Sequence, residues 1–123
     1  MSDNLHEKGI QLRAQLWGEK DARQRHDEMK QFDEGFADFL NEQLFGSIWT
    51  RPGLPVKTRS FITMAALMAL GRVNQLRVHM QGALNLGITP GEIKELIIHL
   101  SQYSGVPTAA EAMRVYREVA EKK

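Results

Sequence analysis

The segment 55–71 contains an almost unbroken apolar run, FITMAALMAL, which constrains the fold more than any other feature of the chain. Pro55 suits the first turn of a helix and Gly71 interrupts the pattern, so we predict a helix here. Because apolar residues lie nearly all round it, this helix needs packing partners on every side. A chain of 123 residues offers few places to bury it, so we expect a homo-oligomer. The alternative is that one flank packs under the N-terminal helices.

The rest of the chain is also predicted to be helical, because no run alternates with the two-residue period of a strand. The further helices are expected over residues 3–16, 21–46, 74–86, 89–103 and 108–121. One stripe of the second helix is expected to carry its large apolar side chains, which are Phe32, Phe36, Phe39, Leu40 and Leu44. The predicted fold is therefore all-α, in a single domain of residues 1–123.

Residues that begin or end helices lie between the predicted helices. Gly18 and Gly87 are suited to ending helices, and Gly105 breaks the next one. A Gly- and Pro-containing loop is expected from Gly46 to Pro55. The sequence Thr89-Pro90-Gly91-Glu92 has the pattern of a capping box, with proline at the first helical position. This is the strongest local signal in the chain.

Composition excludes several classes of function. There is no cysteine, so disulfides, thiolate metal sites and thiol redox chemistry are ruled out. The net charge is only +1, which argues against a nucleic-acid-binding face. No apolar run approaches the roughly 20 residues that span a bilayer. The N-terminal MSDNLHEKG is polar and unlike a secretory signal, so we expect a cytoplasmic protein without membrane contact.

His79 is the most informative candidate for chemistry. Leu76, Ala83 and Leu86 share its predicted helix face, so that face should point inward. Gln75 and Arg72 lie four and seven residues earlier, on the same side. A histidine in this setting can act as a general acid or base near neutral pH. The alternative is a core histidine whose ring bonds a backbone carbonyl.

A second histidine, His99, is predicted to share a helix face with Glu95 and Tyr103. This arrangement could form an acid–base relay. It could equally be a hydrogen-bonded ladder on the surface at a subunit contact.

Three arginines fall in the central segment, at Arg51, Arg59 and Arg72. Arginine suits carboxylate substrates because its planar fork makes paired hydrogen bonds. Each could instead be a solvated charge or a structural ion pair. Trp49 precedes them in the predicted loop, where it could wall a pocket or fill an interface.

Metal and nucleotide sites are not indicated. The histidines at positions 6, 26, 79 and 99 show no short ligand spacing, and no HExxH, P-loop, GxGxxG or GxSxG motif occurs. From the residues alone, the prediction is a helical oligomer with a histidine site.

Three stretches together resemble the carboxymuconolactone decarboxylase family: RPGLPVKTRSFITMAALMALGR, LRVHMQGALNLGITPGEIKEL and YSGVPTAAEA. The likeness extends upstream through FGSIWTRPGL to Gly18, Arg13 and Gly9, nearly the whole chain. It implies an alkyl hydroperoxidase D-like orthogonal bundle of about six to seven helices, assembled as a trimer or hexamer. The peroxidases of that superfamily carry a CxxC pair, which would fall at Arg72 and Gln75, so thiol peroxidase chemistry is excluded here.

The resemblance implies an enzyme that decarboxylates 4-carboxymuconolactone to 3-oxoadipate enol-lactone in aromatic catabolism, without metal or cofactor. We expect His79 as the proton donor and Gln75, Tyr103 and His99 as further catalytic candidates. Substrate binding is expected from Arg51, Arg59, Arg72 and Trp49. The chain departs from the family pattern at Gln75, usually acidic, and at Leu86, usually asparagine. The alternatives are therefore a decarboxylase or isomerase of a related lactone or keto acid, and a catalytically silent helical assembly.

Overall fold

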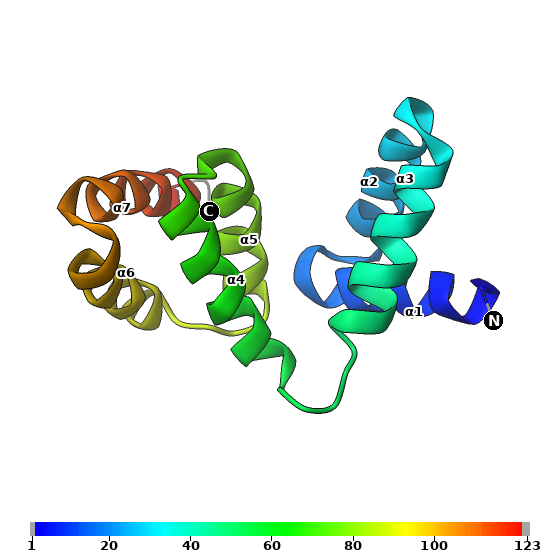
Figure 1. Cartoon of the computed structure of the whole chain (residues 1–123), viewed down its shortest axis with the longest axis horizontal. Helices are drawn as coiled ribbons and strands as arrows, with labels where there is room; N and C mark the ends of the chain where they lie inside the picture. Colours follow the sequence, from blue (N-terminus) through cyan, green and yellow to red (C-terminus); the bar gives the residue numbers. More distant parts are fainter. Residues whose placement is uncertain (1, 122–123) are drawn as a thin grey trace. The chain divides into compact units, whose positions relative to one another are not determined.

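The computed structural model describes residues 2–121, and all regular secondary structure in that part of the chain is helical (Figure 1). Seven α-helices and one π-helix occur there, with no strand. In chain order they are α1 (Ser2–Trp17), α2 (Glu19–Phe32), α3 (Glu34–Phe39), η1 (Leu40–Ile48), α4 (Val56–Leu70), α5 (Val73–Asn85), α6 (Pro90–Ser104) and α7 (Val106–Glu121). They form two compact units, one ending at Val56 and the other beginning at Lys57. The single domain expected from the sequence stays a prediction.

The N-terminal unit is built on α1, which packs against both η1 and α2. Gly18 ends α1 with a φ of 88°, a conformation that favours glycine. The core of this unit is mainly aliphatic and aromatic, and its buried hydrophobic residues are Ile10, Leu12, Leu16, Ala22, Ala37, Phe45 and Trp49. The predicted first helix, 3–16, is confirmed with one added residue at each end.

The single helix predicted over 21–46 is wrong, because the chain breaks it at Asp33. Asp33 adopts an extended conformation, and its Oδ2 accepts a hydrogen bond of 2.7 Å from the backbone N–H of Phe36. The side chain thus caps α3 and ends α2, an alternative to continued helix that aspartate offers locally. The chain then widens into the π-helix η1, which extends to Ile48 and shortens the predicted loop.

The predicted apolar stripe of this region is not buried in the single chain. Phe32 is 86% exposed, Phe39 61% and Phe36 49%. Leu44 is also exposed, and Leu40 is half-buried. Helical periodicity indicates which side chains share a face, but not whether the chain itself covers that face.

The C-terminal unit, α4 to α7, has one continuous core. Met64 and Met68 of α4 pack there with Leu76 and Met80 of α5, and α6 and α7 complete the cluster. The capping box is confirmed. The Thr89 hydroxyl accepts from the Glu92 N–H at 3.0 Å, and the Glu92 carboxylate accepts from the Thr89 N–H at 2.9 Å, which lowers the pKa of Glu92. Gly87 and Gly105, at φ 92° and 98°, mark the ends of the flanking elements as predicted.

Helix α4 buries one face only. Ser60, Met64 and Met68, spaced four residues apart, are buried, whereas Ile62 is 52% and Leu70 68% exposed. Burial all round, expected from the sequence, is therefore not achieved within one chain. The expectation of an oligomer is consistent with this exposure but is not tested by it.

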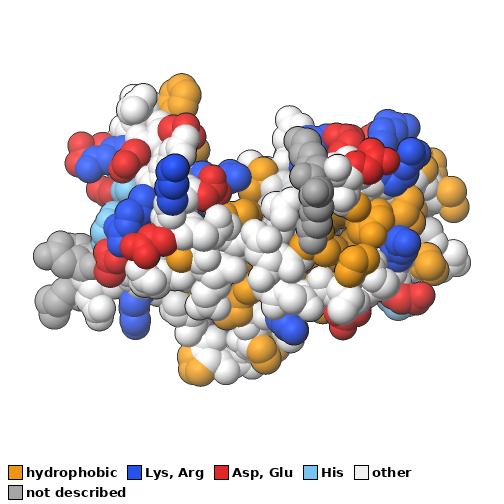
Figure 2. All heavy atoms as spheres, turned by 180° about the vertical axis from the view of Figure 1, so that it is seen from behind, with side chains coloured by type: hydrophobic (Ala, Val, Ile, Leu, Met, Phe, Trp, Pro, Cys, Tyr) orange, Lys and Arg blue, Asp and Glu red, His pale blue; other side chains and the backbone are white. Residues whose placement is uncertain are grey.

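The surface mixes charges of both signs. On the face in Figure 2, Lys and Arg side chains alternate with Asp and Glu over both units, with hydrophobic side chains between them. No helix between residues 2 and 121 is both long and apolar enough to cross a membrane.

Candidate active site

Helix α5 places His79 on its inward face. The side chain is 8% exposed, and Leu76 and Ala83 beside it are 2% and 0% exposed. Leu86, just beyond the helix, is half-buried. The inward orientation expected from the helical spacing is therefore found. Little of the residue therefore meets solvent, and its ring Nδ1 is buried.

Gln75 and Arg72 lie at the start of the same helix and are exposed. Both line a shallow hollow of ≈ 320 Å³ with Gly71, Val73 and Asn74. Arg72 is the residue that precedes the first turn of α5. Because Arg72 and His79 are seven residues apart, they lie on one side of the helix, separated by roughly 10 Å along its axis.

His99 and Tyr103 meet on α6 by ring stacking. Their ring centroids are 5.2 Å apart with an interplanar angle of 29°. Both residues are exposed, Tyr103 by 79%. His99 and Glu95 also line an open groove of ≈ 720 Å³ whose apolar walls are Phe61 and Leu96. The predicted shared face is thus found, with stacking as the contact that joins the two rings.

The other predicted substrate-binding residues do not gather at one place. Trp49 is 5% exposed and packs on Phe45, with ring centroids 6.1 Å apart. It belongs to the N-terminal unit, as does the exposed Arg51. Arg59 is half-buried in the first turn of α4, whereas Arg72 follows the end of that helix. The eleven helical steps from Arg59 to Leu70 span roughly 16 Å, so these two arginines belong to opposite ends of α4.

A buried polar cluster in the N-terminal unit received no role from the sequence. The Arg13 guanidinium lies 4.8 Å from the centre of the Phe45 ring, and burial together with the charge of Arg25 lowers its pKa to about 10. The ring of His26 is 5.0 Å from that of His6, and burial lowers the pKa of His26. Asn41 donates to the backbone oxygen of His6 at 3.0 Å.

A signal for this cluster was present in the sequence. Arg13 falls between Leu12 and Leu16 in the first helix, and Ile10 is one turn earlier. All three aliphatic side chains are buried. A charged residue within such an apolar stretch is the pattern that could have indicated a buried guanidinium.

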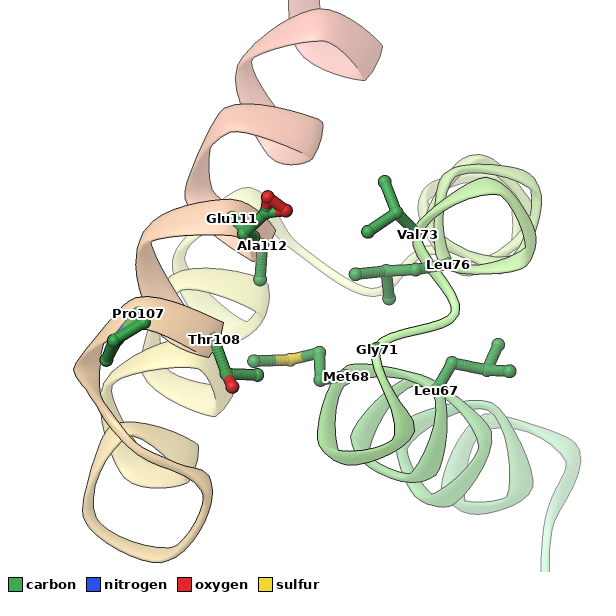
Figure 3. Close-up of a pocket in the computed structure, with 9 residues that line it drawn as sticks. All are labelled: Leu67, Met68, Gly71, Val73, Leu76, Pro107, Thr108, Glu111 and Ala112. Atoms are coloured by element: carbon green, nitrogen blue, oxygen red, sulfur yellow. The ribbon is translucent and has the colours of Figure 1, made fainter.

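A half-open pocket of ≈ 200 Å³ lies between the end of α4, the start of α5 and the start of α7 (Figure 3). Its lining residues are Leu67, Met68, Gly71, Val73, Leu76, Pro107, Thr108, Glu111 and Ala112. Most of this lining is apolar. Over residues 2–121, no group of three His, Asp or Glu side chains is arranged to hold a metal ion.

The fold and these residues define a class: a small all-helical protein with a buried histidine on the same helix as an exposed arginine and amide. The sequence profile of the carboxymuconolactone decarboxylase family matches residues 34–118, and the chain belongs to this family.

Two relatives extend the comparison over nearly the whole chain. A 4-carboxymuconolactone decarboxylase of Acinetobacter baylyi is 40% identical over 117 residues, which cover 95% of this chain and 87% of the relative. A nitrosuccinic acid decarboxylase of Metarhizium robertsii is 31% identical over 118 residues, covering 93% and 82%. Both relatives are named as decarboxylases.

Proposed function

We propose that this chain is a carboxy-lyase that converts 4-carboxymuconolactone to 3-oxoadipate enol-lactone without a cofactor. The observation that carries the proposal is the 40% identity to a 4-carboxymuconolactone decarboxylase over 95% of the chain. Membership of the carboxymuconolactone decarboxylase family supports it. The substrate is then a small carboxylated lactone, and the pathway is aromatic catabolism in the cytoplasm.

The substrate of this reaction supplies its own electron sink. Breaking the bond from the ring γ-carbon to its carboxylate releases CO₂ and leaves the electron pair on that carbon. The pair is conjugated through the ring alkene to the lactone carbonyl, so the negative charge reaches the carbonyl oxygen. A proton added at the α-carbon then gives the enol-lactone. The protein must hold a carboxylate, stabilise the oxyanion and deliver one proton.

One side of α5 offers these three functions in order. Arg72 is exposed in the hollow and suits the carboxylate that does not react. Gln75, one turn before His79, can donate its amide hydrogen to the oxyanion, and such a donor is typically worth about 3 kcal/mol. His79, which is 8% exposed, is the proton donor in this proposal.

The remaining predicted residues have roles that stay proposals. His99 and Tyr103 form a second candidate proton source and oxyanion donor on α6. Arg51 and Arg59 are candidate ligands for a carboxylate, and Trp49 is a candidate wall of the substrate pocket. Each role can be tested by a single substitution at its residue.

The direct test is a coupled assay. A cycloisomerase generates 4-carboxymuconolactone from carboxymuconate, the protein is added with no metal or cofactor, and CO₂ and the enol-lactone are measured. We expect rapid turnover by the unmodified protein. His79→Gln should lower kcat by about 10² to 10⁴, the usual contribution of a general acid.

The matched control is His99→Gln, which removes the exposed histidine of α6. If His79→Gln retains full turnover while His99→Gln loses it, the proton donor is on α6. Absence of turnover by a correctly folded preparation of the unmodified protein would contradict the proposed reaction itself.

Decarboxylation of a related substrate is the second candidate. Gln75 stands where the resemblance leads one to expect an acidic residue, and Leu86 where it leads one to expect asparagine. The relative named nitrosuccinic acid decarboxylase supports a family with more than one substrate. A panel of carboxylated lactones, β-keto acids and nitro acids, each followed by CO₂ release, distinguishes the candidates. The compound with the highest kcat/KM identifies the substrate.

We also propose that the working form is a homo-oligomer, a trimer or a hexamer. Support comes from large apolar side chains exposed in the single chain on both units, among them Phe32, Phe39, Ile62 and Leu70. Single chains seldom expose so many large apolar groups unless another surface covers them.

A further inference from the structure

The apolar pocket at the start of α7 is not used by the proposed reaction. Figure 3 shows Leu76 and Val73 extending from α5 toward α7, with the Met68 thioether reaching across from α4. Ala112 forms the wall on α7, and it is 1% exposed. The pocket volume is ≈ 200 Å³. An apolar protein cavity of about 150 Å³ can bind benzene, so one ring of five or six atoms fits this space.

The two polar groups of the lining are both hydrogen-bond acceptors toward a ligand. The Thr108 hydroxyl donates its hydrogen to the Ser104 carbonyl at 3.1 Å, so its oxygen is left to accept. The Glu111 carboxylate also accepts, and its nearest cation, Arg114, is 3.9 Å away. That arginine side chain is 71% exposed, so the pair is weak. A complementary ligand must therefore bring an N–H or O–H donor.

This chemistry separates the pocket from the proposed decarboxylase site. Glu111 is the one charged residue of the lining, and its negative charge disfavours a substrate with carboxylates. Arg72, Gln75 and His79 do not line the pocket. The pocket-facing flank of α5 is the one that packs against α7.

We propose that this pocket is a second small-molecule site, which binds a monocyclic compound that carries a hydrogen-bond donor and no negative charge. The ring occupies the apolar space between Met68, Leu76 and Ala112. The donor group lies toward Thr108 and Glu111. The pocket adjoins the hollow beside Gln75, since Gly71 and Val73 line both, but no residue with a role in the proposed reaction lines the pocket.

The test uses the full chain, labelled with ¹⁵N, and three probes of one size. Benzylamine carries a charged donor, benzyl alcohol a neutral donor, and benzoate a negative charge with no donor at neutral pH. Amide shifts are followed during titration with each probe. We expect benzylamine and benzyl alcohol to shift the amides of Leu76, Thr108 and Ala112, and benzoate to leave them unmoved at the same concentrations.

Two variants on α7 provide the matched comparison. Glu111→Gln removes the pocket carboxylate, and we expect it to weaken benzylamine binding by about two- to fivefold, as for a partly exposed ion pair. Binding of benzyl alcohol should change little. Glu121→Gln removes a carboxylate with a similar 3.9 Å arginine contact outside the pocket. This variant should therefore bind both donor probes as tightly as the unmodified protein.

Three results would overturn the proposal. The first is no localised amide shift with either donor probe. The second is benzoate binding in the pocket as tightly as benzylamine. The third is that Val73→Phe, whose larger side chain should fill part of the pocket, binds benzyl alcohol as tightly as the unmodified protein does. Val73 is half-buried and Glu111 is exposed, so we expect both variants to fold. The same spectra check their folding.

Discussion

At the residue scale, the N-terminal unit buries two ionisable side chains, Arg13 and His26. Arg13 and His26 are 5% and 4% exposed, and each shows a pKa lowered chiefly by burial. A lowered pKa means that the folded state holds the charged form less well than the unfolded chain does. Arg13 stays charged at neutral pH, since its pKa is about 10. Of these two groups, His26 is therefore the one whose charge changes on mild acidification.

Acid should destabilise this unit through His26. Its pKa lies below the ordinary 6.5, held down by burial and by the charges of His6 and Arg13, against the opposing Asp38 and Asp27. As the pH falls through about 6.5, the unfolded chain takes up the proton first, so stability is lost on acidification. Urea unfolding at pH 7.5 and 5.5 measures this change in the free energy of unfolding. Tryptophan fluorescence suits it, because both tryptophans, Trp17 and Trp49, are in this unit.

The variant His26→Gln should lose part of that pH dependence, because the glutamine does not titrate. His99→Gln, which alters an exposed histidine of the other unit, is the control and should keep it. An unchanged difference between the two pH values in His26→Gln would assign the acid sensitivity to another group.

A second prediction at this scale concerns the carboxylate ligand. Arg72 and Arg59 lie at opposite ends of α4, so a single lactone beside Gln75 can meet Arg72 more readily. Arg72→Gln should raise KM about tenfold or more, since a charge-assisted pair with the substrate is lost. Arg59→Gln is the matched substitution, and initial rates over a range of substrate concentrations compare the two. A larger rise in KM for Arg59→Gln would move the carboxylate site to the start of α4.

At the scale of elements, the close approach of α1 and η1 depends on a glycine. A Cβ on Gly9 would meet the backbone oxygen of Asn41 and lie 2.7 Å from its Oδ1. If α1 and η1 moved apart to make room, the hydrogen bond from Asn41 to the His6 carbonyl would be disturbed. Gly46 of η1 makes a comparable approach, since a Cβ on it would lie 2.5 Å from the backbone oxygen of Leu5 in α1.

Gly9→Ala should therefore lower the free energy of unfolding of the N-terminal unit by about 1–3 kcal/mol, the usual range for overpacking. The control is Gly35→Ala in α3, where the nearest side-chain atom to the new Cβ is 3.4 Å away. It should be neutral or slightly stabilising, because alanine favours helix over glycine. Urea unfolding followed by tryptophan fluorescence reports both. Equal stability of the two variants would mean that α1 and η1 can separate freely.

At the scale of the whole molecule, exposed aromatic residues predict self-association. Light scattering during gel filtration should give a mass of three or six times 14.0 kDa. Phe39→Ser should reduce that mass if the exposed stripe of the N-terminal unit forms a contact. Lys30→Ser, an exposed polar site on the same unit, should leave it unchanged. A monomer at all concentrations would contradict the oligomer proposal.

Local sequence patterns predicted much of the fold. The Thr89 capping box and the glycines at 18, 87 and 105 act through backbone conformation within a few residues, so they can be read from sequence. The spacing around His79 correctly indicated a buried face, because helical geometry fixes which residues are neighbours on a helix.

Other features depend on contacts between distant segments, so only the tertiary structure decided them. The break at Asp33 arises because a capping side chain competed successfully with continued helix, which periodicity does not reveal. The separation of Arg59 from Arg72, the burial of Arg13 against Phe45 and the pocket beside Thr108 follow from how helices pack. The sequence thus determined the helices and the family, because both are encoded in local residue patterns. Packing decided which polar groups are buried and where cavities form, because both depend on residues far apart in the chain.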